Sequence, residues 1–151
     1  KDALELDAGT FARVMDVNVR GLLLASRAAA RRMPDGGAIV LLASVNAFQT
    51  EARFADYNAS KGAAVLLTRT LAIDWAARGI RVNAVCPGYV RTPMTEAYLA
   101  DPATLAGILS HVPLGRVSSP DEIAATIAFL ASPEAAYITG SSVIIDGGRS
   151  A

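Results

Sequence analysis

Residues 36–44 read GGAIVLLAS, and this short stretch decides the fold. Two glycines open it, an uninterrupted apolar run follows over residues 38–43, and Ser44 closes it. Such continuous runs are typical of strands that are covered on both faces of a parallel sheet, whereas half-exposed strands alternate between apolar and polar residues. The stretch therefore predicts a buried strand of a parallel sheet with a polar residue at its carboxyl end.

Helical patterns flank this strand on both sides. Asp7 can cap a helix that continues to Met33, where the turn-forming residues 34–37 end it. A second helix is expected over residues 56–78, because Gly79 suits the left-handed turn that follows a helix. Further strands are predicted at residues 81–86 and 142–146, and further helices at 102–110 and 119–130. This alternation predicts an α/β fold with a parallel sheet and right-handed crossovers.

The composition limits the partners and the setting. The 151 residues are 52% hydrophobic, which is enough for one compact domain over 1–151, and 14 basic residues balance 14 acidic ones. Such a neutral chain is not expected to bind nucleic acid or a membrane surface, so a small-molecule partner is predicted. One cysteine and one histidine indicate neither a disulfide nor a metal centre, and no apolar run approaches the roughly 20 residues of a membrane span. A reducing, cytoplasmic location is expected.

A possible proton-transfer site begins with Tyr57 and Lys61, which share one face of the second predicted helix. A tyrosine hydroxyl is a weak acid with a reference pKa of about 10, and one cation about 4 Å away stabilises a phenolate by about 4 kcal/mol. Ser44 ends the preceding strand, and ligands of open α/β sheets bind outside the carboxyl ends of strands. The alternative is that Tyr57 packs on the sheet, Lys61 is solvated and Ser44 hydrogen-bonds loop amides.

Five motifs in this order and spacing closely resemble the short-chain dehydrogenases/reductases. They are Asn18 within NVRG, Ser44, YNASK over residues 57–61, RVNAVCPG over residues 81–88, and residues 138–148, which read ITGSSVIIDGG. The resemblance implies the C-terminal part of a doubly wound, Rossmann-like parallel sheet with helices on both faces. The N-terminal βαβ units of that fold, including the family's glycine-rich turn, do not occur in the sequence.

The resemblance also implies an activity and a catalytic tetrad. Tyr57 would act as the general acid/base at the reacting oxygen, Ser44 would orient that oxygen, and Lys61 would favour the phenolate and bind the nicotinamide ribose. Asn18 would complete the tetrad: its counterpart in the family interrupts the long helix and holds a water that links the lysine to solvent. The expected reaction interconverts a carbonyl and a secondary alcohol by hydride transfer, with NAD or NADP as cofactor.

Residues 87–117 resemble the family's cofactor-binding and substrate-binding segments. Pro87, Gly88, Val90 and Thr92 are expected to hold the nicotinamide, although a strand-ending turn would equally explain the first two. Residues 94–117 resemble the substrate lid and predict a mostly apolar pocket wall. Besides Ser44 and Tyr57, the substrate contacts expected there are Tyr89 and Met94.

Two predictions concern association. The helices over residues 7–33 and 56–78 are apolar around much of their circumference, and the corresponding family helices form a dimer interface, so a homodimer or homotetramer is expected. The alternative function is that of a truncated, non-catalytic half that associates with itself or a partner, because its sheet would expose an unpaired edge strand. The sequence leaves open the substrate, the direction of reaction and the choice between NAD and NADP.

Overall fold

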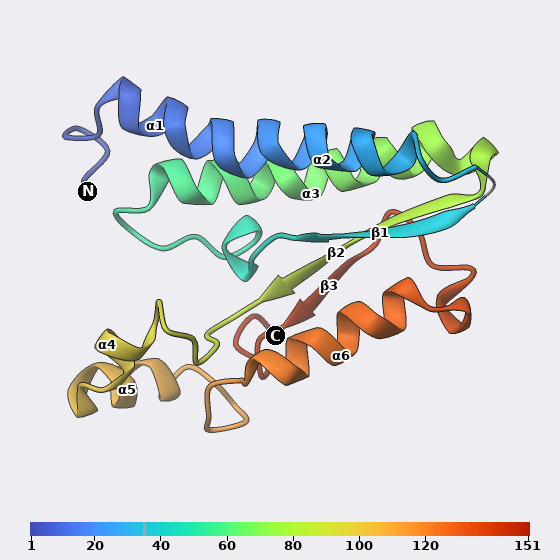
Figure 1. The fold of residues 1–151 in the computed structure, drawn as a ribbon. Helices are drawn as coiled ribbons and strands as arrows, with labels where there is room; N and C mark the ends of the chain where they lie inside the picture. The colour runs from blue at the N-terminus through green and yellow to red at the C-terminus, as the bar shows by residue number, and fades with distance from the viewer. Residues whose placement is uncertain (35) are drawn as a thin grey trace.

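The structure is a computed structural model that describes residues 1–34 and 36–151. Three parallel strands form a sheet in the order β1-β2-β3, with α1, α2 and α3 on one face and α6 on the other (Figure 1). The strands are β1 (Gly37–Leu42), β2 (Ile80–Pro87) and β3 (Ser142–Ile145), and the four helices are α1 (Ala8–Met15), α2 (Gly21–Ala30), α3 (Ala55–Trp75) and α6 (Pro120–Ala131). The predicted α/β fold with helices on both faces of a parallel sheet is confirmed.

The long helix predicted over residues 7–33 is interrupted in its middle. A π-helical segment, η1 (Asp16–Arg20), separates α1 from α2, and the Gly21 N–H donates to the Asp16 carbonyl five residues back. One extra residue per turn bulges a helix, and such bulges are frequent at functional sites. The interruption that the family resemblance implied at Asn18 is thereby confirmed, although apolar spacing alone predicted one continuous helix.

The two ends of this helical region are set by local hydrogen bonds. The Asp7 carboxylate accepts a hydrogen bond from the Thr10 N–H at 2.8 Å, as the sequence predicted. The other end comes at Ala30 rather than Met33, because the Met33 N–H bonds to the carbonyl three residues back instead of four. The predicted turn over residues 34–37 includes residue 35, which lies outside the described residues.

Strand β1 lies at one edge of the sheet, and the prediction of a strand covered on both faces is only half right. Leu41 is buried beneath the helices at 4% exposure, whereas the side chain of Leu42 on the opposite face is 51% exposed. Within residues 1–34 and 36–151, β1 pairs with β2 alone. The apolar run is typical of an inner strand with both faces buried. In this chain only the face of β1 beneath the helices is buried.

Helix α3 is the longest, and it ends as its sequence predicts. A 3₁₀ turn, η3 (Ala76–Arg78), follows it, and Gly79 has the left-handed φ of 67°. The side that faces the sheet is closely packed, while Leu66 and Ile73 on the other side are 62% and 77% exposed. In the described part of the chain, no helix has the length and apolarity needed to cross a membrane.

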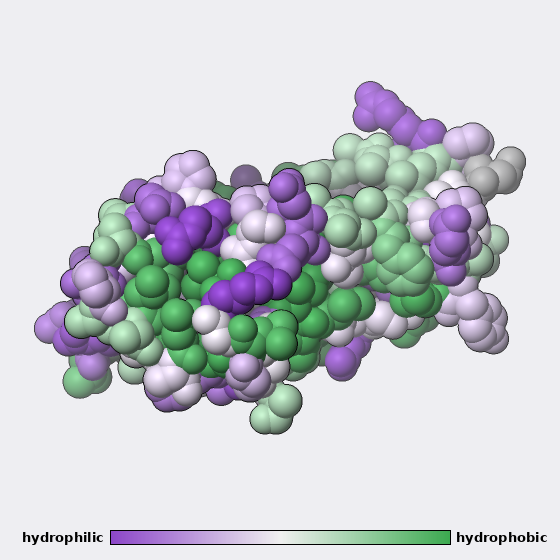
Figure 2. Space-filling view, turned by 90° about the horizontal axis from the view of Figure 1, so that it is seen from below, coloured by the Kyte–Doolittle hydropathy of each residue, from purple (hydrophilic) through white to green (hydrophobic). Residues whose placement is uncertain are grey.

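Two short helices, α4 (Glu96–Leu99) and α5 (Pro102–Leu109), fill the segment between β2 and α6. They lie beyond the carboxyl ends of β2 and β3 (Figure 1). The sequence predicted α5 but missed α4, which is too short to show a period. Seen from below, apolar side chains gather over the half of the molecule that contains these helices, with hydrophilic side chains among them (Figure 2).

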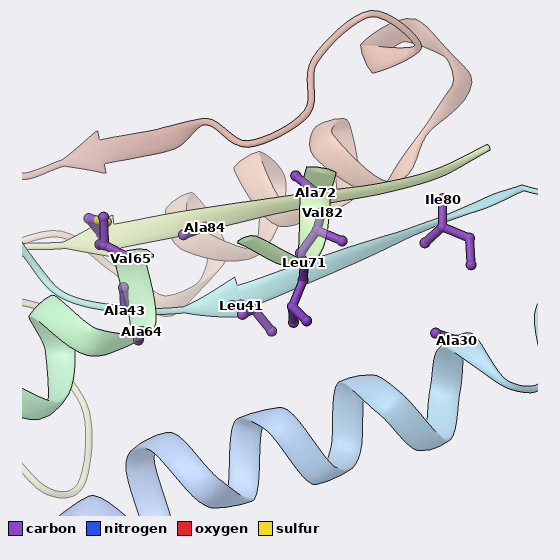
Figure 3. Close-up of a cluster of buried hydrophobic side chains, with 11 residues drawn as sticks. Ala30, Leu41, Ala43, Ala64, Val65, Leu71, Ala72, Ile80, Val82 and Ala84 are labelled. Carbon is purple, nitrogen blue, oxygen red and sulfur yellow. The ribbon is translucent and has the colours of Figure 1, made fainter. Parts of the chain in front are cut away.

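The main core lies between the sheet and the helices α2 and α3 (Figure 3). Much of it is alanine, including Ala64 and Ala72 on α3 and Ala84 on β2. Small side chains let a helix approach a sheet closely, so the few large residues, such as Leu41 and Ile80, fill the remaining space. Alternate residues of β2 point to the other face, where Val85 packs with Ile123 and Leu130 of α6.

The start of α6 confirms the capping motif predicted from the sequence. The Glu122 N–H donates to the Ser119 side chain at 3.4 Å, and the Ser119 N–H donates to the Glu122 carboxylate at 2.8 Å. Arg116 also pairs with Glu122 at 2.6 Å, and this hydrogen bond is the main reason why the pKa of Glu122 falls to about 2. The helix start is thereby fixed to the end of the α4–α5 segment.

Replacing Ser119 with Ala is expected to destabilise the protein by about 1 kcal/mol, the usual cost of losing a cap side chain. Urea unfolding followed by circular dichroism measures it. The matched control is Ser150→Ala at an exposed position outside the helices, which should leave the unfolding midpoint unchanged. Equal unfolding curves for the Ser119 variant and the wild type would show that the cap adds nothing.

Candidate active site

Ser44 lies where the sequence predicted, at the carboxyl end of β1. Its side chain is 7% exposed and caps the 3₁₀ turn η2 (Val45–Ala47), because its Oγ accepts the Asn46 N–H at 3.2 Å. This is the loop-amide role that the sequence left open as an alternative. A hydroxyl that accepts one hydrogen bond still has its own proton to donate, so the two roles are compatible.

Tyr57 and Lys61 meet on the first turns of α3. The Lys61 Nζ lies 5.5 Å from the centroid of the Tyr57 ring and donates to the Leu42 carbonyl at 3.0 Å. Burial lowers the pKa of Lys61, while the nearby Cys86 thiol acts in the opposite direction. The structure therefore brings a partly desolvated cation beside the phenol ring at the end of β1.

Asn18 lies in the π-helical bulge, and its side chain hydrogen-bonds to helix α3. Its Nδ2 donates to the Ser60 Oγ at 3.0 Å, and that hydroxyl donates to the Tyr57 carbonyl at 2.8 Å. Ser60 is fully buried and was not identified from the sequence. Its position three residues after Tyr57, on the same helix face, was the available signal. The bulge thus connects Asn18 to the backbone of the helix turn that carries Tyr57.

The predicted nicotinamide segment begins at the carboxyl end of β2. The Gly88 N–H donates to the Ile145 carbonyl at 2.9 Å, and a Cβ on Gly88 would lie 2.8 Å from that of Asp146. Glycine is therefore required here for packing of the two strand ends, whatever else the turn does. Pro87 immediately precedes it as the last residue of β2.

Val90 and Thr92 are both hydrogen-bonded to neighbouring residues. Val90 forms a parallel bridge with Ser118, and its carbonyl accepts the Thr95 hydroxyl at 2.7 Å. The Thr92 N–H donates to the same hydroxyl at 2.8 Å. Both residues lie beyond the strand ends, on the edge that carries Ser44, and their cofactor role stays a prediction.

The two other predicted substrate contacts differ in their positions. Met94 is 88% exposed, so it is not brought to the other site residues. Tyr89 is half-buried, and its hydroxyl donates to the Glu51 carboxylate at 2.7 Å. Burial, and then this carboxylate, raise the pKa of Tyr89 to about 12, so its hydroxyl stays protonated.

Glu51 and Arg149 form an ion pair that the sequence did not indicate. Arg149 Nη2 lies 2.8 Å from Glu51 Oε1, and the guanidinium stacks over the Tyr89 ring at 4.9 Å. The Glu51 carbonyl accepts the side chain of Asn58, the neighbour of Tyr57, at 2.9 Å. The partners are 98 residues apart, so only the folded chain reveals them.

A family model described as enoyl-(acyl carrier protein) reductase matches residues 1–150. A short-chain dehydrogenase/reductase of Serratia marcescens is 41% identical, with a TM-score of 0.93 over 100% of this chain and 61% of its own. The chain belongs to the short-chain dehydrogenase/reductase family. The resemblance predicted from its motifs is confirmed.

Curated short-chain dehydrogenases/reductases match along nearly the whole chain. Galactitol 2-dehydrogenase (L-tagatose-forming) of Cereibacter sphaeroides is 49% identical over 97% of this chain and 59% of its own length. The 3beta-hydroxysteroid dehydrogenase 1 of Eggerthella lenta is 43% identical over 90% of this chain and 53% of its own. A structure of 4-hydroxyisoleucine dehydrogenase complexed with NADH superposes with a TM-score of 0.96 at 37% identity, covering 99% of this chain and 63% of that one. The chain thus spans less than two thirds of the length of these relatives.

Proposed function

We propose that the protein is an NAD(P)-dependent oxidoreductase that interconverts a carbonyl and a secondary alcohol by hydride transfer. The observation that carries this proposal is the Lys61 ammonium 5.5 Å from the Tyr57 ring, at the strand end that presents Ser44. Membership of the family supports it, and so do relatives whose names are those of dehydrogenases. The four residues Asn18, Ser44, Tyr57 and Lys61 are its proposed catalytic set.

Each of these side chains has a distinct task in the proposed reaction. The Tyr57 hydroxyl gives its proton to the carbonyl oxygen during reduction and takes it back during oxidation. Ser44 donates its free proton to the same oxygen and holds it beside the phenol. Lys61 stabilises the phenolate through its charge, and this interaction is strengthened by the partial exclusion of water. Asn18 positions the start of α3 through Ser60.

The residues present fit the nicotinamide and its ribose, which form one end of the cofactor. Lys61 uses one N–H for the Leu42 carbonyl, and an ammonium has three donors, so two can serve the hydroxyls of a ribose. Pro87, Gly88, Val90 and Thr92 border the position next to it and would hold the carboxamide. The cofactor supplies or accepts the hydride when it is bound. Neither NAD nor NADP is favoured by these residues.

The test is cofactor-dependent turnover by the intact protein. Incubation with NAD or NADP and a panel of secondary alcohols should change the nicotinamide absorbance, and the corresponding ketones should reverse the change with the reduced cofactor. If neither cofactor changes with any alcohol or ketone of the panel, the proposed function is wrong. The cytoplasmic location expected from the presence of a single cysteine stays a prediction.

Exposed apolar side chains on the helical region α1–α3 indicate that the protein forms an oligomer. Val17, Leu24, Leu66 and Ile73 are 44% to 77% exposed and lie on the helices that the sequence predicted as an interface. We expect a homodimer or homotetramer in sedimentation velocity, and we expect Leu66→Glu with Ile73→Glu to shift the mass towards the monomer. A wild-type protein that sediments as a monomer at all concentrations would contradict this prediction.

A second candidate, a self-associating module without catalysis, is favoured by one observation. Among the described residues β1 pairs only with β2, which leaves its outer edge open for another strand. The turnover assay separates the two candidates, since the second predicts association without any cofactor-dependent change.

A further inference from the structure

Asn58 follows Tyr57 on α3, and hydrogen bonds hold both ends of its side-chain amide. Its Nδ2 donates to the Glu51 carbonyl at 2.9 Å, and its Oδ1 accepts the Asn46 Nδ2 at 3.0 Å. A carbonyl can only accept, so the nitrogen of Asn58 must face Glu51 and the oxygen must face Asn46. The amide therefore has one orientation in which both bonds form.

The bond to Asn46 connects this amide to Ser44. The backbone N–H of Asn46 donates to the Ser44 Oγ at 3.2 Å, while its side chain donates to Asn58. Ser44 and Asn46 are 7% and 8% exposed. Water has little access to replace these bonds, so the loss of one leaves a buried polar group without a partner. A hydrogen-bonded path thus joins Ser44 to the residue that follows Tyr57.

The other end of the amide is anchored by Glu51. The Glu51 carboxylate accepts the Tyr89 hydroxyl at 2.7 Å and lies 2.8 Å from the Arg149 guanidinium. Glu51 belongs to residues 48–54, which connect η2 to α3 outside any helix or strand. In the same segment Arg53 has a left-handed φ of 69°, a conformation that persists only where surrounding contacts hold it. The turn after β2 and the C-terminal segment therefore fix the backbone to which Asn58 bonds.

The direction of the Ser44 hydroxyl matters for the proposed reaction, on which this inference rests. Ser44 uses one acceptor position for the Asn46 N–H, and its proton stays free for the reacting oxygen. A reacting group that is misplaced by about 1 Å lowers the rate by about 100-fold. The bond from Asn46 therefore decides whether the hydroxyl stays aligned with the Tyr57 phenol.

We propose that Asn58 is a positioning residue of this reaction, which acts through Asn46 to hold the Ser44 hydroxyl beside Tyr57. The amide takes part in no proton or hydride transfer, and its effect on the rate is confined to the geometry of Ser44. It differs in this from Lys61 on the next turn of the same helix, whose charge acts on the phenol directly.

Replacing Asn58 with Ala removes both bonds of the amide and suits a helix. The Lys61 bond to the Leu42 carbonyl at 3.0 Å still attaches α3 to the end of β1, so the variant should fold, which circular dichroism checks. We expect kcat of the intact protein to fall about 10-fold to 100-fold with KM little changed. Thr50→Ala, at an exposed position of the loop before α3, is the control and should keep wild-type kinetics. A wild-type kcat in the Asn58 variant would overturn the inference.

A comparison with Ser44→Ala separates positioning from a general loss of structure. If Asn58 acts through Ser44, adding Asn58→Ala to Ser44→Ala should lower kcat no further, because no hydroxyl remains to be held. Losses that multiply in this double variant would overturn the inference. Asn46→Ala breaks the same bridge from its other side and should give a similar loss of kcat, so it provides the same test if Asn58→Ala does not fold.

Hydrogen exchange measured by NMR tests the bridge without any turnover. The Asn46 N–H is bonded to the Ser44 Oγ, so its exchange rate reports how firmly this pair is held. In Asn58→Ala it should exchange about tenfold faster, while the N–H groups in the middle of α3 keep their rates. Unchanged exchange at Asn46 would overturn the inference whatever the kinetics show. Faster exchange at Asn46, in a protein that turns over no alcohol or ketone, would reject the proposed oxidoreductase and support the bridge.

Discussion

Replacing Tyr57 with Phe is expected to lower kcat by about 100-fold to 10,000-fold, the range that general acid/base catalysis contributes. The variant keeps the ring 5.5 Å from Lys61 and removes only the hydroxyl that would exchange the proton. The Tyr57 ring packs edge-on against Phe54, with 6.4 Å between centroids, so the phenyl group should keep its place. Substrate KM should change little, because Ser44 remains to bind the reacting oxygen.

The measurement is steady-state turnover of the intact protein, using the alcohol that gives the highest rate. Tyr137→Phe is the matched control, since its side chain is fully exposed and lies outside the proposed site. Its kcat should equal that of the wild type. If the Tyr57 variant kept more than about half of the activity, the assignment of Tyr57 as general acid/base would be wrong.

The second large effect is expected on stability, at Asn83. This residue is 1% exposed on the α6 face of β2, where its Nδ2 donates to the Ile138 carbonyl at 2.8 Å. Its Oδ1 accepts the Ser141 N–H at 3.0 Å, so one amide fixes the turn that leads into β3. Asn83→Leu keeps the branched shape, with bulkier methyl groups, but removes both hydrogen bonds, and we expect the free energy of unfolding to fall by about 3 kcal/mol.

Urea unfolding of the intact protein measures this difference. Thr70→Val is the control, because its hydroxyl bonds to the Leu66 carbonyl at 3.1 Å on an exposed helix surface, and the cost there should stay below about 0.5 kcal/mol. A loss below about 1 kcal/mol at Asn83 would show that water replaces the amide at the turn. The Arg81 guanidinium also donates to the Ile138 carbonyl at 3.3 Å. This carbonyl therefore keeps one hydrogen bond in the Asn83 variant, which limits the expected loss of stability.

The fold was largely predictable, because its signals are local. Ser119 and Glu122 marked the start of α6 through contacts within one turn, and Gly79 marked the end of the α3 region through its own backbone. The parallel sheet followed from the order of apolar and helical segments. Ser44, Tyr57 and Lys61 lie within 18 residues of one another in the sequence, and the family resemblance of their motifs, rather than their spacing alone, assigned their roles.

Features that depend on the register of distant segments were not predictable. The hydrogen bond from Asn18 to Ser60 joins positions 42 residues apart, and the exposure of Leu42 depends on which strands are present beside it. The apolar pocket wall expected from residues 94–117 stays a prediction, because the sequence shows the apolar residues but not the side of α5 that a substrate would meet.

By itself, then, the sequence determined the α/β class, the parallel sheet and the identity of the proposed proton-transfer residues. Only the tertiary structure decided that Glu51, Tyr89 and Arg149 meet. The physical reason is the range of the interactions. Caps, turns and helix faces are set by residues a few positions apart, whereas an ion pair across 98 positions forms only when the sheet brings its strand ends together.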